Sequence, residues 1–341
     1  MLRFLSSLFT GTAERSGGVD EALLEKAIDR VVVGTDPRIR ALGDYQKRLR
    51  EPVGQAVSHV IDLVDALPPP VAISPRAFSE DSGIRAFFVS TEHLRKVLGG
   101  FSTVRDYLTD LAELPPDDIF GLLTMAREER NVFGMELDGD NLRRDVMQVS
   151  VNFRNHRYLG PTGNELDTRR ELKIRAFDFL IEKTLERITG ERGKRLELDQ
   201  QRHLLQQKLD AMKAGQWGLG MMLIDNEGQR PSLAKLEEKI NLIDAELGQF
   251  HSDKLGLEES LAYVVDTLGR PSDWLATREI HLRLDYRGIK LADSSAASAR
   301  EITLTELFSG TGECRAVLLG RIARADVPEP PDIWNAAKSY L

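Results

Sequence analysis

Two series of mostly apolar residues, stepping alternately by three and four positions, limit what this chain can fold into. The second series is apolar at ten of its eleven positions, which are Leu233, Leu236, Ile240, Ile243, Leu247, Phe250, Lys254, Leu257, Leu261, Val264 and Leu268. The first series consists of Ile174, Phe177, Ile181, Thr184, Ile188, Glu191, Arg195, Leu198, Arg202, Leu205, Leu209 and Met212. This spacing keeps one stripe of a helix against a partner helix. The two series therefore predict a long antiparallel coiled-coil hairpin.

One ion pair is expected to set the register of this hairpin. If the chain folds back between Met212 and Leu233, each position of one series faces a position of the other. Lys254, the only charged residue of the second series, then faces Glu191 of the first. Polar residues at single seam positions commonly lower stability and fix the register. We therefore expect Glu191 and Lys254 to form the register pair.

The first series is the weaker of the two. Thr184, Arg195 and Arg202 also occupy seam positions, and Gly190 and Gly193 lie near the middle. A glycine inside a helix costs about 1 kcal/mol relative to alanine. Two alternatives follow for this segment: an unbroken helix, or a helix that kinks near the glycines.

The connector between the two predicted helices, residues 214–230, is longer than a helical hairpin needs. Its large apolar residues are Trp217, Leu219, Met221, Met222, Leu223 and Ile224. Methionine side chains are unbranched and polarizable, which suits an adaptable binding surface. Exposed apolar patches often mark contacts with other molecules. The connector is therefore either a docking tip or a local cap that closes the hairpin.

The composition is typical of a soluble globular protein. The chain has 341 residues, of which 41% are hydrophobic and 29% charged, and it is long enough for two or three domains. The net charge of −8 argues against nonspecific nucleic-acid binding, which depends on clustered positive charge. The single cysteine, Cys314, excludes an intrachain disulfide and a cysteine-based zinc site. This usage is compatible with the cytoplasm, where we expect the protein to act.

The first nine residues, Met1 to Phe9, are the candidate for contact with a membrane surface. No run of 18 or more apolar residues predicts a transmembrane helix. Met1 to Phe9 is apolar with one positive charge, but it lacks the apolar core and cleavage site of a signal peptide. It is either a small amphipathic contact with a membrane surface or a packed or disordered terminus.

Changes of pattern along the chain predict its domains. Residues 1–18 form a flexible or amphipathic N-terminus, 19–75 a helical module, and 326–341 a tail. Residues 76–165 and 273–325 carry strand patterns on either side of the predicted hairpin, residues 166–272. The predicted fold class is α+β, with an N-terminal helical module and an antiparallel β-sheet domain interrupted by the coiled-coil hairpin. Because the two ends of a helical hairpin lie side by side, one interrupted sheet is the economical assembly. Separate β domains are the alternative.

Several strands are predicted by local pattern. Alternation is clearest at Met147–Phe153 and Ile280–Tyr286, and two further strands are expected around Ile302 and Val317. Ala86–Val89 is predicted to be a short buried strand. Residues 119–125 and 132–137 are predicted to form a hairpin whose turn is the charged segment 128–131.

The sequence carries no recognisable catalytic, cofactor or metal signature. The six histidines are scattered and none forms His-x-x-x-His or His-Glu-x-x-His. We therefore predict no catalytic residues, no cofactor and no metal. Arg154, His281 and Arg283 are weak candidates for lining a polar pocket in the sheet domain.

Three classes of function follow from these observations. The first is a noncatalytic structural protein whose coiled-coil arm mediates homo-oligomer assembly or partner docking through its apolar tip. The second is a peripheral membrane scaffold that uses Met1 to Phe9, the tip, or both. The third is a ligand-binding or enzymatic sheet domain of unknown chemistry. Arm length, tip composition and the missing catalytic signature favour the first.

Overall fold

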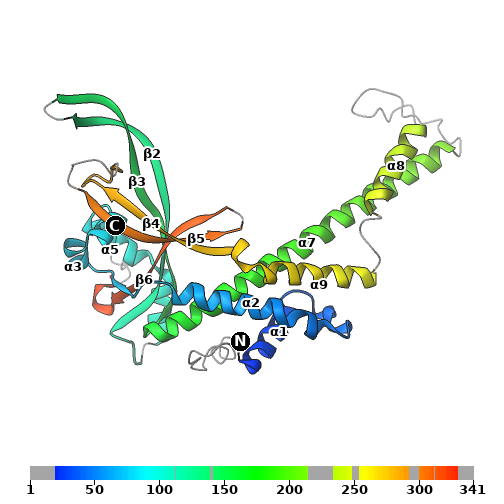
Figure 1. The fold of residues 1–341 in the computed structure, drawn as a ribbon, viewed down its shortest axis with the longest axis horizontal. Coiled ribbons are helices and arrows are strands. Elements are labelled where there is room, and N and C mark those ends of the chain that lie inside the picture. Colours follow the sequence, from blue (N-terminus) through cyan, green and yellow to red (C-terminus); the bar gives the residue numbers. More distant parts are fainter. Residues whose placement is uncertain are drawn as a thin grey trace, which may run out of the picture. The chain divides into compact units, whose positions relative to one another are not determined.

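The computed structural model describes residues 20–111, 113–138, 141–213, 233–247, 253–291, 299–310 and 312–328 (Figure 1). The chain forms two compact units. We call Val57–Asp178 with the chain from Pro271 onward the sheet unit, and Val19–Ala56 with Phe179–Arg270 the helical unit. The fold is mixed helix and antiparallel sheet, which confirms the predicted α+β class.

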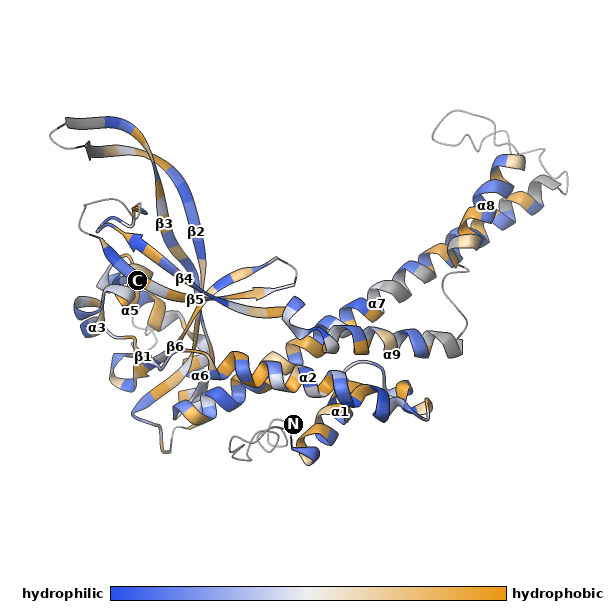
Figure 2. Cartoon of the chain, viewed as in Figure 1, coloured by the Kyte–Doolittle hydropathy of each residue, from blue (hydrophilic) through white to orange (hydrophobic). Residues whose placement is uncertain are grey.

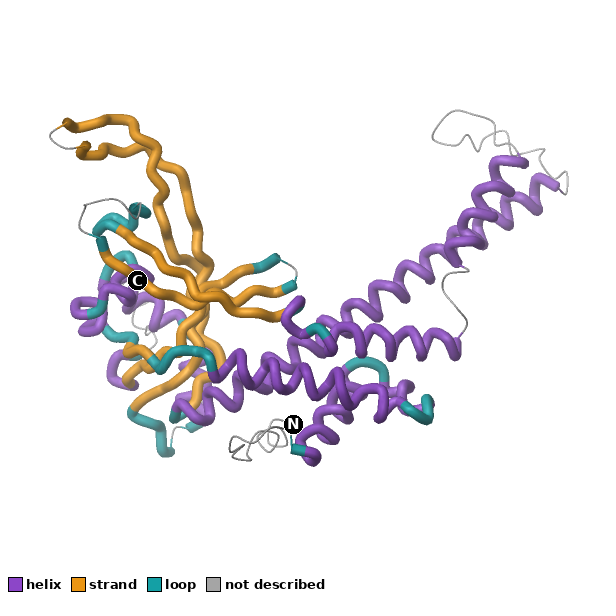
Figure 3. The backbone as a smooth tube through the Cα atoms, viewed as in Figure 1, coloured by secondary structure: helices purple, strands orange, loops and turns teal. Residues whose placement is uncertain are grey.

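The sheet unit contains one sheet whose strands come from both sides of the helical segment. Its strands are β1 (Val71–Ala72), β2 (Asp118–Asp138), β3 (Asn141–Thr162), β4 (Leu275–Leu284), β5 (Arg300–Ser309) and β6 (Cys314–Ala323). Their order is β3-β2-β6-β5-β4, all antiparallel, with β1 added parallel to β6. β2 and β3 continue as a two-stranded ribbon past Met125, the last β2 residue paired with β6 (Figure 3).

A short segment after β4 forms hydrogen bonds with both outer strands of the sheet, β3 and β4. The Asp285–Gly288 turn, with Gly288 at φ +81°, brings Ile289 and Lys290 back alongside β4. The Val151 amide donates to the Gly288 carbonyl at 2.9 Å, and the Lys290 amide donates to the Val149 carbonyl at 2.8 Å. Part of the outer edge of β3 is therefore paired rather than open.

Four short helices cover the inner face of the sheet. They are α3 (Pro75–Glu80), α4 (Ser82–Phe87), α5 (Thr91–Gly100) and α6 (Ser102–Asp110). Side chains cap three of them, because Ser74, Asp81 and Ser90 accept hydrogen bonds from first-turn amides. The shared core includes Ile84, Phe88, Leu94, Leu98, Leu123, Met125, Phe153, Leu282, Ile302 and Leu304. Two 3-10 turns, η4 (Pro271–Asp273) and η5 (Arg324–Asp326), complete the unit.

A pair of facing glycines makes room for one buried tyrosine. Gly121 of β2 pairs with Gly320 of β6. A Cβ atom on Gly121 would lie 2.4 Å from Cε1 of Tyr158, and one on Gly320 would lie 3.2 Å from Cε2. The Tyr158 hydroxyl reaches the Gly320 carbonyl at 2.8 Å and the Ile119 carbonyl at 3.1 Å. A side chain at Gly121 would therefore displace the ring, and one at Gly320 would crowd it and would also meet Ile73 Cδ1 at 2.4 Å.

Two local predictions about strands are wrong. Ala86 and Phe87 end helix α4, because Asp81 accepts hydrogen bonds from the Gly83 and Ile84 amides and starts a helix there. Residues 119–137 form one continuous strand, β2, rather than a hairpin. The charged segment 128–131 is not a turn, because its residues pair with β3 in the ribbon.

The helical unit contains α1 (Glu21–Gly34), η2 (Pro37–Ala41), α8 (Leu233–Leu247) and α9 (Asp253–Gly269). It also contains the first part of α2 (Tyr45–Asp65) and most of α7 (Glu165–Lys213). α2 continues through Pro52. An internal proline costs about 3 kcal/mol, which the complete burial of Leu49, Val53 and Ala56 offsets.

The two predicted coiled-coil helices differ in continuity. α7 is unbroken over 49 residues, so it does not break at Gly190 and Gly193. The second series is divided between α8 and α9, and residues 248–252 lie outside the described residues.

Candidate functional site

The outer part of α7 packs against α8, and we call residues 194–213 with 233–247 the α7–α8 arm. Its seam is a cluster in which Leu205 packs against buried Leu209, Leu236 and Ile240. The predicted register places Leu209 opposite Leu236 and Leu205 opposite Ile240. Beside this cluster, the Arg202 guanidinium donates to the Asp244 carboxylate. Apolar and polar residues alternate along both helices (Figure 2). The coiled-coil hairpin as a whole stays a prediction.

α7 meets α9 through a polar contact. Arg187 donates through Nη1 to Asp266 Oδ2 at 2.9 Å and to Thr267 Oγ1 at 2.7 Å. Its guanidinium carbon lies 5.1 Å from the centre of the Tyr263 ring, in the range of a cation–π contact. The hydrogen bond from Arg187 is the main reason that the pKa of Asp266 is lowered.

The predicted tip and register pair fall largely outside what the structure describes. Residues 214–230, with all six tip side chains, lie outside the described residues. Glu191 belongs to α7 and Lys254 to α9, but their side chains are also outside the described set. Four other apolar side chains of the arm are exposed: Leu196, Leu204, Leu233 and Leu242.

The three weak pocket candidates bind different partners. Arg154 lies on β3 with its Nε 3.6 Å from Glu128. His281 lies on β4, where Nδ1 is 3.0 Å from the Thr303 hydroxyl. Arg283 of the same strand has its Nε 3.8 Å from Glu301. The structure therefore does not bring these side chains to a common partner.

A buried charged cluster in the sheet was missed at the sequence level. Glu306 of β5 is 1% exposed, and its carboxylate accepts from Arg127 Nε at 2.6 Å and from Arg278 Nη2 at 2.7 Å. The Arg278 guanidinium also lies 4.2 Å from the centre of the Phe308 ring. Burial alone would raise the pKa of Glu306, but the hydrogen bonds from both arginines and Cys314 outweigh it and lower that pKa.

Cys314 is poorly suited to nucleophilic chemistry at this place. Burial, together with its hydrogen bond to Glu306, raises the pKa of the thiol to about 11. The thiol is therefore protonated at neutral pH, and the thiolate is the nucleophilic form. Both oxygens of Glu306 are engaged by arginines, so the cluster has the character of a structural ion-pair network.

Strand periodicity contains the signal that identifies this cluster. Ile302, Leu304 and Glu306 alternate along β5 and share its inner face. A carboxylate at that position has to be paired, because an isolated buried charge is very unfavourable. Arg127 and Arg278 occupy the corresponding inner positions beyond Met125 and Ile280.

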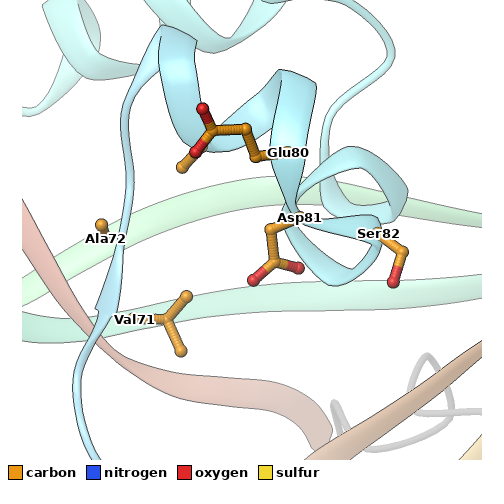
Figure 4. A pocket seen from close by; sticks show the side chains of 6 residues that line it. Val71, Ala72, Glu80, Asp81 and Ser82 are labelled. Atoms are coloured by element: carbon orange, nitrogen blue, oxygen red, sulfur yellow. The ribbon is translucent and has the colours of Figure 1, made fainter.

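A cavity of about 540 Å³ lies beside β1 (Figure 4). Its lining residues are Val71, Ala72, Ala77, Glu80, Asp81 and Ser82. Both of its carboxylates are already used: Glu80 accepts from Arg76 at 3.0 Å, and Asp81 caps α4. The cavity therefore offers little further polar chemistry.

The outer part of the β2–β3 ribbon carries exposed apolar side chains. Phe133 is directly opposite Met147 in the register, and both are largely exposed, as is Met135. This patch is on the same face as the buried residues Val151 and Phe153 farther along β3. The pattern shows that the inner face of the sheet continues outward along the ribbon.

Comparison of the chain with protein-family models, curated proteins and solved structures found no match. Within the described part of the chain, no helix is long and apolar enough to cross a membrane. The same residues contain no group of three or more His, Cys, Asp or Glu side chains placed to hold a metal ion.

Proposed function

We propose that this chain is a noncatalytic interaction protein that acts in the cytoplasm. Its α7–α8 arm carries residues 214–230 to a second copy of the chain or to a protein partner. The packing of Leu205 and Leu209 against Leu236 and Ile240 is the observation that carries this proposal. That packing supports an arm that presents the connector between its two helices.

Helix α8 is short, so its stability depends on packing against α7. α8 has only 15 residues, and isolated helices of that length are marginal in water. Burial of Leu236 and Ile240 against α7 supplies stabilisation that propensity alone does not. The ion pair between Arg202 and Asp244 is exposed, so it contributes little to stability and mainly helps to align α8 with α7.

Deleting residues 214–230 and joining the helices with a short glycine-containing turn tests the role of the connector. We expect a folded protein that has lost self-association or partner binding, because the six large apolar side chains are removed. Mass by light scattering and pull-down of a second tagged copy measure the effect, and circular dichroism checks the fold. An unchanged mass together with unchanged capture would reject the docking role.

Leu236→Asp is predicted to release α8 from α7. Burying a leucine contributes roughly 1.5–3 kcal/mol, so amide protection in α8 should fall about tenfold or more. Hydrogen exchange read by mass spectrometry measures this change. Leu242→Asp is the matched control, because Leu242 belongs to the same helix and is exposed. Equal loss of protection in both variants would show that the seam does not hold α8.

The alternative function is a peripheral membrane scaffold that uses Met1 to Phe9. Liposome flotation of the full chain and of a version that lacks Met1 to Phe9 separates the two. Flotation that depends on these residues would favour the membrane role, whereas a chain that stays with the soluble fraction and self-associates would favour the interaction role.

A further inference from the structure

Two histidines and a phenylalanine form one contact cluster in the sheet unit. The His156 ring of β3 stacks on Phe88, with ring centres 4.9 Å apart at an angle of 17°. The His93 ring of α5 meets His156 edge-on, with centres 5.6 Å apart. Phe88 belongs to residues 88–90, which we call the α4–α5 linker. Two imidazoles therefore lie in contact beside this linker.

A bulge in β3 gives His156 this direction. Thr124 of β2 pairs with Arg157, whereas Ala126 pairs with Arg154, so Asn155 and His156 together oppose one residue of β2. Asn155 has φ +53°, a left-handed conformation that is uncommon for a residue with a side chain. Bulges of this kind redirect side chains and are frequent beside functional sites. Here the bulge brings His156 under the linker.

Both histidines hold the backbone around the linker through hydrogen bonds. His156 Nε2 lies 2.9 Å from the Phe87 carbonyl, so Nε2 carries the proton and donates. The Val89 amide donates to His93 Nδ1 at 3.2 Å. Nδ1 of His93 can accept this bond only as long as it is unprotonated. The observed bonds therefore require a neutral His93.

We propose that His93 and His156 form a pH-sensitive switch that releases the α4–α5 linker from β3 when both imidazoles become protonated. Protonation of His93 removes the acceptor of the Val89 amide. Protonation of His156 places a second positive charge next to the first one, with the two ring centres 5.6 Å apart. Phe88 is 2% exposed, so release of the linker uncovers an apolar side chain.

The surroundings of His156 favour its neutral form. Burial lowers the pKa of His156, the bond to the Phe87 carbonyl opposes this, and His93 lowers it further. Among the groups described around His156, His93 from α5 is the titratable one, α4 contributes the Phe87 carbonyl, and the linker contributes the Phe88 ring. Because the folded pKa is below the unfolded value of about 6.5, the stabilisation is complete above that value. It is lost as the pH falls from there through the folded pKa.

Nuclear magnetic resonance of the full chain between pH 7.5 and 5 tests this proposal. At pH 7.5 we expect the ring nitrogens of both histidines to show the neutral form protonated at Nε2. On acidification, the protection factor of the Val89 amide should fall at least tenfold, whereas amides in β5 keep theirs. Protection factors already include the change of intrinsic exchange rate with pH.

Two substitutions sharpen the test. His93→Gln keeps a hydrogen-bond acceptor and cannot be protonated, so the Val89 amide should lose most of its acid response. His281→Gln is the matched control, because His281 is an exposed histidine of the same unit and its removal should leave that response unchanged. A protection factor for Val89 that stays constant down to pH 5 in the unmodified chain would overturn the proposal. So would a His93 ring that is already protonated at Nδ1 at pH 7.5.

Discussion

Replacing Glu306 by glutamine should lower the free energy of unfolding of the sheet unit by about 3 kcal/mol. Glutamine keeps the shape of the side chain but removes the charge that Arg127 and Arg278 share. The Arg127 side chain is only 18% exposed, so its charge would stay in a poorly hydrated place without this carboxylate. Urea unfolding at pH 7, followed by circular dichroism, measures the change as a lower midpoint with an unchanged slope.

Glu301→Gln is the control for this prediction, because it makes the same chemical change on the same strand. Its side chain is 82% exposed and lies 3.8 Å from Arg283, so the loss should stay below about 1 kcal/mol. If the two variants lost similar amounts of unfolding free energy, the buried cluster would stabilise the fold no more than the exposed ion pair does.

Acidic pH should destabilise the sheet unit by protonating the Glu306 carboxylate. The folded pKa of Glu306 is below its usual value, so its stabilisation is complete above the unfolded pKa of about 4.3. It is lost as the pH falls from there through the folded pKa. The Glu306→Gln variant should therefore lose less stability than the unmodified chain over that acidic range, in the same urea experiment.

Gly121→Ala should destabilise the sheet unit by about 3 kcal/mol. The new Cβ would lie 2.4 Å from Tyr158 Cε1 and 2.9 Å from the Leu159 carbonyl oxygen, so both a ring and the backbone would have to move. Moving the ring also disturbs the hydrogen bonds from its hydroxyl to the Ile119 and Gly320 carbonyls. Thermal and urea unfolding measure the loss.

Gly100→Ala provides the comparison at a glycine with free space. A Cβ there would meet nothing within 4 Å, and the position has no positive φ. We expect no loss or a small gain, because alanine restricts the unfolded chain. If Gly121→Ala also caused no loss of stability, the packing of the Tyr158 ring against the sheet would not require a glycine at position 121.

Side-chain periodicity predicts best those strands that have one face toward solvent and the other toward the core. The segments around Val151, Leu282, Leu304 and Leu319 all lie in strands of one sheet. The first three alternate as half-buried strands should, whereas β6 is buried on both faces, with Leu319 and Gly320 both buried. The same periodicity marks Glu306 as an inward-facing carboxylate. Local sequence does not predict that Arg127 and Arg278 pair with Glu306, because the order of the strands brings these residues together.

Where the local sequence is ambiguous, longer-range structure decided the outcome. The charged segment 128–131 has the composition of a turn, but its backbone is paired with β3 across its whole length. Ala86–Val89 is as apolar as a buried strand, yet the cap at Asp81 makes its first half helical. The His93–His156 contact has no local signal either, since it depends on a bulge in β3.

The order of the strands links completion of the sheet to the synthesis of β6, the last of its strands along the chain. β2 pairs with β6, and the paired residues are 191 positions apart for Met125 and Ala316 and 205 apart for Asp118 and Ala323. At about 5–20 residues per second, β6 leaves the ribosome on the order of 10–40 s after β2. During that interval β2 has one open edge, and open strand edges pair readily with other chains. We therefore expect nascent chains to depend on a chaperone that shields β2 until β6 is available to pair with it.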